Sequence, residues 1–162
     1  MKRTSVRALT QTGLIAALYV VLTLPFGQIA FGPIQFRLAE LLTLLPLFTP
    51  WAIPGVTIGC LLSNLLFSTP LDAMIGTVAT LLAAWLTYRC KKDWLAPIPP
   101  ILFNGLMIGA MLTYLTTGGF SFGVFALMAL EVGASEFVVC FLIGLPFIKM
   151  IRHYKLDRFL KE

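Results

Sequence analysis

Long apolar runs, broken by short clusters of proline, glycine and charged residues, are the dominant feature of this sequence. Hydrophobic residues make up 59% of its 162 positions and charged residues 12%, against about 45–50% and about 25% in soluble domains. A soluble fold of this size would have too little polar surface to cover itself. The sequence therefore predicts an all-α integral membrane protein.

Six segments approach the roughly 20 apolar residues that a helix needs to cross a bilayer core. The breaks between them carry helix-ending residues, such as the Pro25, Gly27, Gly32 and Pro33 of the first break. The second and third segments are short, so we expect that they tilt or do not cross the bilayer fully. We expect one domain over residues 1–162, with helices at approximately 8–24, 34–48, 51–67, 71–88, 97–117 and 121–148.

The basic residues predict the orientation of these helices. Eleven of the 12 Lys and Arg residues lie in the N-terminus, in the 89–93 loop or in the C-terminal tail. Six spans place these three regions on one side, and the positive-inside rule makes that side the cytoplasm. The basic tail is explained by contact with the lipid bilayer, and nucleic-acid binding is not expected because no basic domain stands clear of the membrane.

Ionisable residues within the apolar segments are few, and each is expensive to place in a membrane, at ~2.5–3.5 kcal/mol or more. Counting 1.5 Å per residue along each helix places these groups and two amides near or below the outer surface, on five different helices. If they face inward, they line a pocket that opens outward and has a polar floor; Glu131 faces this pocket or a neighbouring subunit. The candidate residues are Arg37, Glu40, Asn64, Asp72, Asn104, Glu131 and Glu136.

Each of these residues also has a purely structural explanation. Arg37 and Glu40, at i and i+3, can pair with each other. Asp72 follows a Thr-Pro pair and suits the first turn of a helix, where the helix dipole favours an acid. Asn104 and Glu136 can hydrogen-bond between helices. The binding-site hypothesis depends on the convergence of all of them.

The first helix carries small residues that let another helix approach closely. Ala8, Thr12 and Ala16 share one side, with Gly13 and Ala17 beside them. Small-xxx-small spacing suits close helix contact, either with a partner protein or with another helix of the same chain.

Several chemistries are excluded by missing motifs. The sole histidine, His153, lies in the tail, so the membrane segments offer no histidine metal site, and no metal or cofactor is expected on this chain. No nucleotide-binding P-loop is present, and no serine has a histidine partner at membrane depth. The sequence predicts a transport protein without its own energy source rather than an enzyme.

Several stretches resemble the queuosine-precursor transporter (QueT) family, whose members are substrate-binding S components of energy-coupling factor (ECF) transporters. The resemblance is carried by the runs IQFRLAELLTLLPLFTPWAIPG, GCLLSNLL, LDAMIGTVATLLAAWLTY, PPILFNGLMIG and SEFVVCFLIGLP, which span most of residues 34–146.

The resemblance implies a six-helix S-component bundle in the plasma membrane with both termini in the cytoplasm. Such a protein binds a vitamin-like solute from outside, under the loop that joins helices one and two. A transmembrane coupling subunit and two ATPase subunits, which use ATP and Mg, supply the energy. Many members dock through an Ala-x-x-x-Ala motif on helix one. This chain offers Gly13-x-x-x-Ala17 and Ala8/Thr12/Ala16 instead.

The implied substrate is a deazaguanine, either queuine or its aminomethyl-deazaguanine precursor. We expect Glu40 or Glu136 to accept hydrogen bonds from the guanine-like edge, because bonds to a carboxylate are strong. Asn104 or Gln35 then reads the carbonyl and the ring nitrogen, since an amide both donates and accepts. Arg37 holds Glu40 ionised and shapes the lid.

The amine of the precursor is cationic, and we expect Asp72 or Glu131 to pair with it. Three alternatives remain open at this point. The chain is an S component for another vitamin-like solute, a stand-alone proton-coupled carrier with Glu131 or Glu136 as its relay, or a membrane scaffold that transports nothing.

Overall fold

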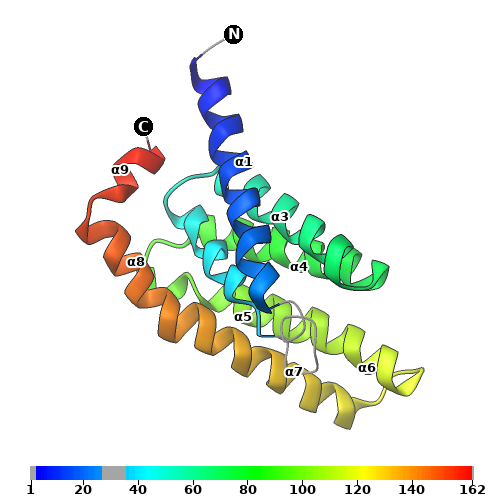
Figure 1. Ribbon diagram of the computed structural model, residues 1–162. Coiled ribbons are helices and arrows are strands. Elements are labelled where there is room, and N and C mark those ends of the chain that lie inside the picture. The colour runs from blue at the N-terminus through cyan, green and yellow to red at the C-terminus, as the bar shows by residue number, and fades with distance from the viewer. Residues whose placement is uncertain (1–2, 27–35, 162) are drawn as a thin grey trace.

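The computed structural model describes residues 3–26 and 36–161, and every regular element in those ranges is a helix (Figure 1). The all-α fold predicted from the sequence is confirmed for these ranges. The 3₁₀ segments are η1 to η3, and the π-helical segments are η4 and η5. In chain order the elements are α1 (Arg3–Thr23), η1 (Leu24–Phe26), η2 (Leu38–Leu47), α3 (Ala52–Phe67), α4 (Pro70–Arg89), η3 (Asp93–Leu95), α5 (Ile98–Phe103), η4 (Asn104–Ile108), α6 (Gly109–Thr117), α7 (Phe122–Glu136), η5 (Phe137–Ile143), α8 (Gly144–His153) and α9 (Leu156–Lys161).

Within the described residues, four helical stretches are long and apolar enough to cross a membrane: Val6–Thr23, Pro70–Arg89, Asp93–Thr117 and Phe122–His153. Two further apolar helices, η2 and α3, are shorter. The sequence predicted that the second and third of its six segments are short. The expected start of the second segment, at residue 34, lies outside the described residues. The last segment continues to His153, past the expected end at residue 148.

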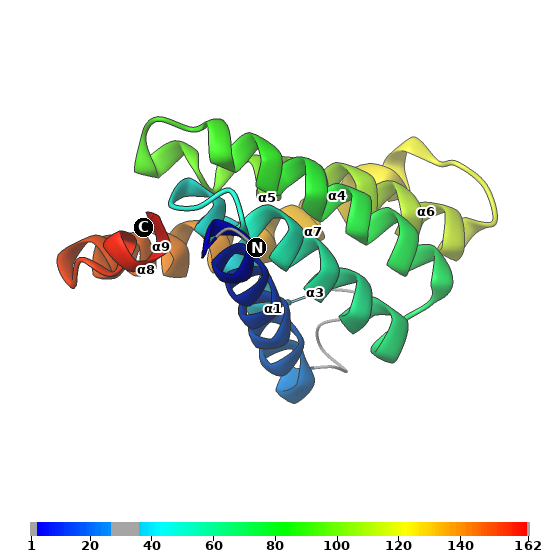
Figure 2. The same ribbon diagram turned by 90° about the horizontal axis from the view of Figure 1, so that it is seen from above.

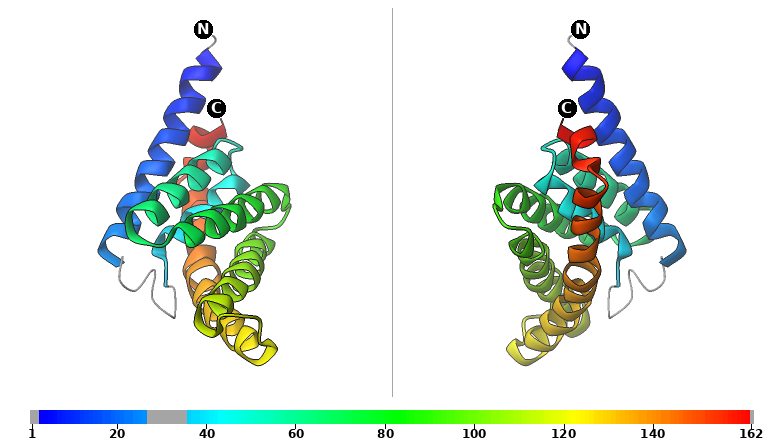
Figure 3. Two further views of the ribbon diagram at one scale, coloured as in Figure 1. Left: turned by 90° about the vertical axis from the view of Figure 1, so that its right-hand side faces the viewer. Right: turned by 90° about the vertical axis from the view of Figure 1, so that its left-hand side faces the viewer.

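Both ends of the chain lie at the same end of the molecule, and the turn between α6 and α7 lies at the opposite end (Figures 1 and 3). Side-chain contacts join the elements at the end where the two termini lie. Arg152 of α8 forms an ion pair with Asp93 of η3, Nη2 to Oδ1 at 2.6 Å. The Gln11 amide of α1 donates to the carbonyl oxygen of Leu160 at 3.4 Å.

Close approach of α1 and α3 depends on glycine. A Cβ atom on Gly59 would lie 2.5 Å from Tyr19 Cβ and 3.0 Å from the carbonyl oxygen of Ala16. A Cβ on Gly55 would lie 2.9 Å from Ile15 Cβ. Because neither glycine has a side chain, α1 packs directly on the backbone of α3 (Figure 2).

Apolar side chains cover the outside of the bundle as well as its core. Leu44 and Ile148 are completely buried, at 0% exposure. By contrast, Leu9, Phe122 and Leu130 are 74%, 75% and 71% exposed. Soluble monomers rarely expose large contiguous apolar surfaces, so this exterior suits contact with lipid chains.

Candidate functional site

Arg37, Asn64 and Asp72 form a buried polar cluster where η2, α3 and α4 meet. Arg37 Nη2 donates to both carboxylate oxygens of Asp72, at 3.2 Å to Oδ1 and 3.0 Å to Oδ2. Arg37 Nη1 donates to Asn64 Oδ1 at 3.1 Å. The side chains of the ion pair are only 5% and 3% exposed. A buried charge is tolerated when a partner and further hydrogen bonds satisfy it, and this cluster supplies both.

The first turn of α4 holds Asp72 in place. Thr69 caps the helix, because its hydroxyl accepts a hydrogen bond from the Asp72 backbone N–H at 3.2 Å, and Pro70 follows at the first helical position. Ser68 Oγ donates to Asp72 Oδ2. A Cβ on Gly76 would lie 3.2 Å from Asp72 Oδ1, so this glycine leaves room for the cluster. Asp72 therefore both occupies the first turn of α4, as its structural explanation predicted, and forms the ion pair with Arg37.

Pairing with Glu40 was one structural explanation of Arg37, but the ion pair that the described residues show for Arg37 is with Asp72. Arg37 binds Asp72 and Asn64, and no hydrogen bond joins it to Glu40 within the ranges that the structure covers. The physical reason is local. Arg37 precedes η2 in an extended conformation, with φ −113° and ψ 99°, so the i, i+3 geometry of a helix does not apply to its side chain.

Glu40, Asn104 and Glu136 form a second buried cluster. Glu40 Oε1 accepts a hydrogen bond from the Tyr19 hydroxyl of α1. Asn104 Nδ2 donates to Glu136 Oε1 at 2.7 Å. The Cys140 thiol lies 3.4 Å from Glu136 Oε2 and 3.6 Å from the Glu40 carbonyl oxygen. These side chains come from α1, η2, η4, α7 and η5. That the polar residues of five helices line one outward-opening pocket stays a prediction.

Two carboxyl groups and one amide therefore share a site that is buried from solvent. Glu40, Asn104 and Glu136 are 1%, 4% and 4% exposed. The two carboxyls are near enough for their charges to interact. Glu40 Oε2 is buried without a hydrogen-bond partner in the described part of the chain. An unpaired buried acceptor is costly, so this oxygen is suited to receive a donor from a ligand.

Helix irregularities coincide with this second cluster. Glu40 lies in η2, a 3₁₀ helix of 10 residues, although runs longer than about 3–4 residues are uncommon. Asn104 begins the π-helical η4, and Glu136 immediately precedes the π-helical η5. π-Helical turns occur often at functional sites, because the widened turn redirects side chains.

Among the described residues that the sequence predicted for the site, Glu131 is not part of either cluster. Glu131 is half-buried on α7. It lies five positions before Glu136, which rotates it by about 140° around the helix axis at 3.6 residues per turn. The two glutamates therefore face different directions. Gln35 lies outside the described residues.

Sequence reasoning missed Tyr19, Ser68 and Cys140 as members of these clusters. A signal was available for Tyr19 and for Cys140. A tyrosine hydroxyl inside an apolar helix needs a partner, and Tyr19 is only 1% exposed. Cys140 is four positions from the predicted site acid Glu136, the spacing at which helical side chains meet. Ser68 lies before α4 in an extended conformation, so helical spacing did not indicate its contact with Asp72.

The small residues of α1 divide between two faces. Ala8 and Ala16 are buried, at 8% and 6% exposure, and a Cβ on Gly55 would lie 3.1 Å from the Thr12 carbonyl oxygen. Ala8, Thr12 and Ala16 therefore lie on the side that packs within the chain. Gly13 and Ala17 are exposed, and a Cβ on Gly13 would meet nothing within 4 Å.

Long apolar helices, an apolar exterior and polar clusters buried between the helices define a helical membrane protein with a candidate solute-binding site. The sequence model of the QueT transporter family matches residues 9–153, so the chain belongs to this family of transporters. The family resemblance seen in the sequence is confirmed.

A curated relative, the queuosine precursor transporter QueT of Lactococcus lactis subsp. cremoris (strain MG1363), is 39% identical over 100 residues. The matched region covers 58% of this chain and 59% of the relative. No solved structure matches the chain.

Proposed function

We propose that this chain is the substrate-binding S component of an ECF-type importer for a queuosine precursor, either queuine or aminomethyl-deazaguanine. Family membership and the name of the relative support the substrate class. The observation that carries the proposal is the cluster of Glu40, Asn104 and Glu136, with its unpartnered Glu40 Oε2.

The chemistry of this cluster suits a guanine-like edge. The ring N–H and the exocyclic amine of such a base are neighbouring donors, and a carboxylate accepts both. Glu40 has one free oxygen for this purpose, while Tyr19 holds the other. Glu136 can take a second donor or the cationic amine, and the Asn104 amide can donate to the ligand carbonyl.

In this proposal Arg37 and Asp72 hold the pocket together instead of binding the amine. Their charges already offset each other, and they join the segment before η2 to α4. This refines the sequence-based assignment of Asp72, because its carboxylate also accepts from Ser68.

Ligand binding by the purified chain tests the pocket. We expect Glu40→Gln, Asn104→Ala and Glu136→Gln each to weaken binding of aminomethyl-deazaguanine by roughly tenfold to a hundredfold, because a hydrogen bond to a charged group is worth ~1.5–3 kcal/mol. Glu131→Gln is the matched control and should change affinity by less than about twofold, since Glu131 lies outside the cluster. Unchanged affinity in all three pocket variants would reject this site. Mass spectrometry of small molecules that co-purify with the chain identifies the preferred deazaguanine.

We also propose that six helices cross or enter the membrane, with both termini in the cytoplasm. The distribution of Lys and Arg supports this orientation. The contacts among α1, η3, α8 and α9 agree with it, since they gather the basic regions at one end. Reagents added to either side of sealed vesicles, acting on single cysteines in the tail or in the 118–121 turn, distinguish the two orientations.

Energy would come from partners, because the sequence has no P-loop of its own. Two ATPase subunits using ATP and Mg would act through a transmembrane coupling subunit. Affinity purification from native membranes should recover all three with the chain.

The paired carboxyls favour one alternative function, a stand-alone proton-coupled carrier, since two acids in one buried site can exchange a proton. A carrier would take up the base in liposomes containing this chain alone under a proton gradient, whereas an S component would bind the base without accumulating it.

A further inference from the structure

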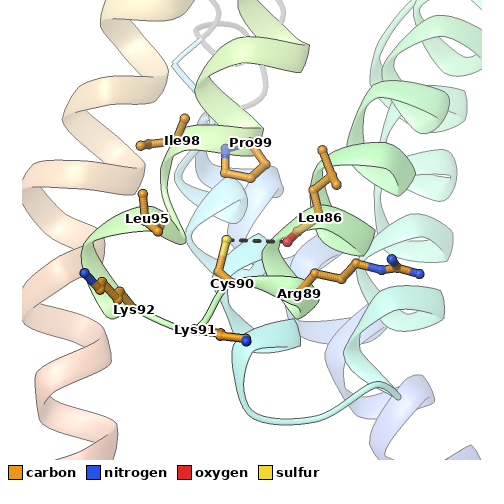
Figure 4. A pocket seen from close by; sticks show the side chains of 8 residues that line it. All are labelled: Leu86, Arg89, Cys90, Lys91, Lys92, Leu95, Ile98 and Pro99. Atoms are coloured by element: carbon orange, nitrogen blue, oxygen red, sulfur yellow. Dashed lines mark hydrogen bonds between the residues drawn. The ribbon is translucent and has the colours of Figure 1, made fainter.

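A hollow lies where α4 ends and α5 begins, and none of the residues of the two polar clusters lines it. Its volume is about 540 Å³. Leu86, Leu95, Ile98 and Pro99 form its apolar wall, and Cys90 lies between them (Figure 4). The Cys90 thiol donates a hydrogen bond to the Leu86 carbonyl oxygen at 3.4 Å, so these two polar groups already have a partner.

Three cations lie along one edge of the hollow. Arg89, Lys91 and Lys92 are exposed, and their side chains point outward at the rim of the hollow (Figure 4). The acid that follows them, Asp93, is paired with Arg152 through bonds of 2.6 Å and 2.9 Å. The charge of Asp93 is therefore offset by α8, and the rim retains a net positive charge.

Exposed aromatic side chains near this rim are typical of the membrane surface. Trp85 and Tyr88 lie near the end of α4 and Trp94 lies in η3, and they are 45%, 47% and 52% exposed. Exposed Trp and Tyr are enriched where lipid headgroups meet the hydrocarbon core. Arg89 lies over the Trp85 ring, with Cζ 4.2 Å from the ring centroid, so one rim cation is held at this level.

We propose that this hollow binds an anionic phospholipid from the adjacent leaflet. The upper part of an acyl chain packs against Leu86, Leu95 and Ile98, and the headgroup phosphate lies among Arg89, Lys91 and Lys92. Basic pockets between helices on the cytoplasmic side of a membrane are suited to acidic headgroups. An apolar wall beneath the cations favours a lipid over a free phosphate ion, because the ion would leave that wall unfilled.

Native mass spectrometry of the detergent-solubilised chain tests this site. Phosphatidylglycerol and phosphatidylcholine with identical acyl chains are titrated separately. We expect the wild-type chain to bind phosphatidylglycerol about tenfold more tightly, because each nearby Lys or Arg strengthens binding to acidic lipid several-fold. The triple variant Arg89→Gln, Lys91→Gln, Lys92→Gln should reduce this preference to less than about twofold. These side chains are exposed, so the variant is expected to fold.

The matched control is the triple variant Lys149→Gln, Lys155→Gln, Arg158→Gln, which removes the same charge from exposed positions of the tail. It spares Arg152, which pairs with Asp93. This control should keep the full preference for phosphatidylglycerol. Equal binding of the two lipids by the wild-type chain, or the same loss of preference in both triple variants, would overturn the proposal.

Two further experiments test the apolar wall and the cationic rim separately. Leu95→Gln makes the wall polar and should weaken binding of both lipids while leaving their ratio unchanged. Inorganic phosphate at millimolar concentration should not displace phosphatidylglycerol. Displacement by phosphate would show that the rim binds a free anion, and the lipid site would be rejected.

Discussion

Arg37 and Asp72 form an ion pair across the interior of the bundle, with Nη2 and Oδ2 3.0 Å apart. The two residues are 35 positions apart in the chain. The pair fixes the backbone just before η2 against the first turn of α4. It therefore joins the start of η2, which carries Glu40, to α4.

Removing one partner of this pair should destabilise the protein strongly. Asp72→Ala leaves the buried Arg37 charge without its counter-ion, which costs about 3–5 kcal/mol in comparable buried pairs. Thermal unfolding in detergent measures the effect. Asp93→Ala is the matched control, because it breaks the exposed pair with Arg152 and should cost about 0–1 kcal/mol. Equal melting temperatures for the two variants would show that the Arg37–Asp72 pair is not structural.

Tyr19→Phe should destabilise the protein through Glu40. The substitution removes the hydroxyl that donates to Glu40 Oε1, and the other oxygen has no partner in the described chain. An unsatisfied buried acceptor costs about 1–3 kcal/mol, more if it is charged. Tyr114→Phe is the control, since Tyr114 is 61% exposed. If the hydrogen bond is the cause, adding Glu40→Leu to Tyr19→Phe should recover part of the loss; no recovery would count against it.

Gly76→Ala should disturb the cluster of Arg37, Asn64 and Asp72. The added Cβ would lie 2.8 Å from Asn64 Nδ2, closer than such atoms approach without a shift. Overpacking of this kind costs about 1–3 kcal/mol. Gly123→Ala in α7 meets nothing within 4 Å, and it should be neutral or slightly stabilising. Chemical or thermal unfolding measures the stability of the two variants. A Gly76→Ala variant as stable as Gly123→Ala would contradict this prediction.

The exposed small-residue face of α1 is the predicted docking surface for the coupling subunit. Gly13→Leu would hold another helix away, because a closely packed interface depends on small residues. We expect co-purification of the partner subunits to fall several-fold while binding of the deazaguanine remains unchanged. Gly123→Leu is the control. Loss of both properties in Gly13→Leu would indicate misfolding, and retention of the partners would exclude this face.

Cys90 should be the thiol that reagents modify in the folded protein, and its reaction should require alkaline pH. Cys60 and Cys140 are each 0% exposed, whereas Cys90 is half-buried. Partial burial raises the pKa of the Cys90 thiol above its ordinary value. Because the thiolate is the nucleophile, the rate of alkylation by iodoacetamide should rise with pH through a midpoint higher than that of a small model thiol. A midpoint at or below the model value would contradict this expectation.

Local sequence pattern was sufficient for the helices but not for their backbone details. Apolar runs and the prolines between them predicted where helices occur, because a chain in a bilayer must satisfy its backbone hydrogen bonds internally. The 3₁₀ geometry of η2 and the π-helical turns at η4 and η5 were not predicted. Such irregular turns depend on packing against neighbouring helices, and the sequence of one helix alone does not specify that packing.

The sequence by itself determined that this chain is helical and lipid-embedded, and which polar residues had to find partners. Both follow from the free-energy cost of exposing polar groups to hydrocarbon, which depends on residue type alone. Tertiary structure decided the partners: Arg37 with Asp72 instead of Glu40, and Glu40 with Tyr19. Pairing depends on which helix faces meet and how each backbone enters its first turn, and those are properties of the assembled bundle.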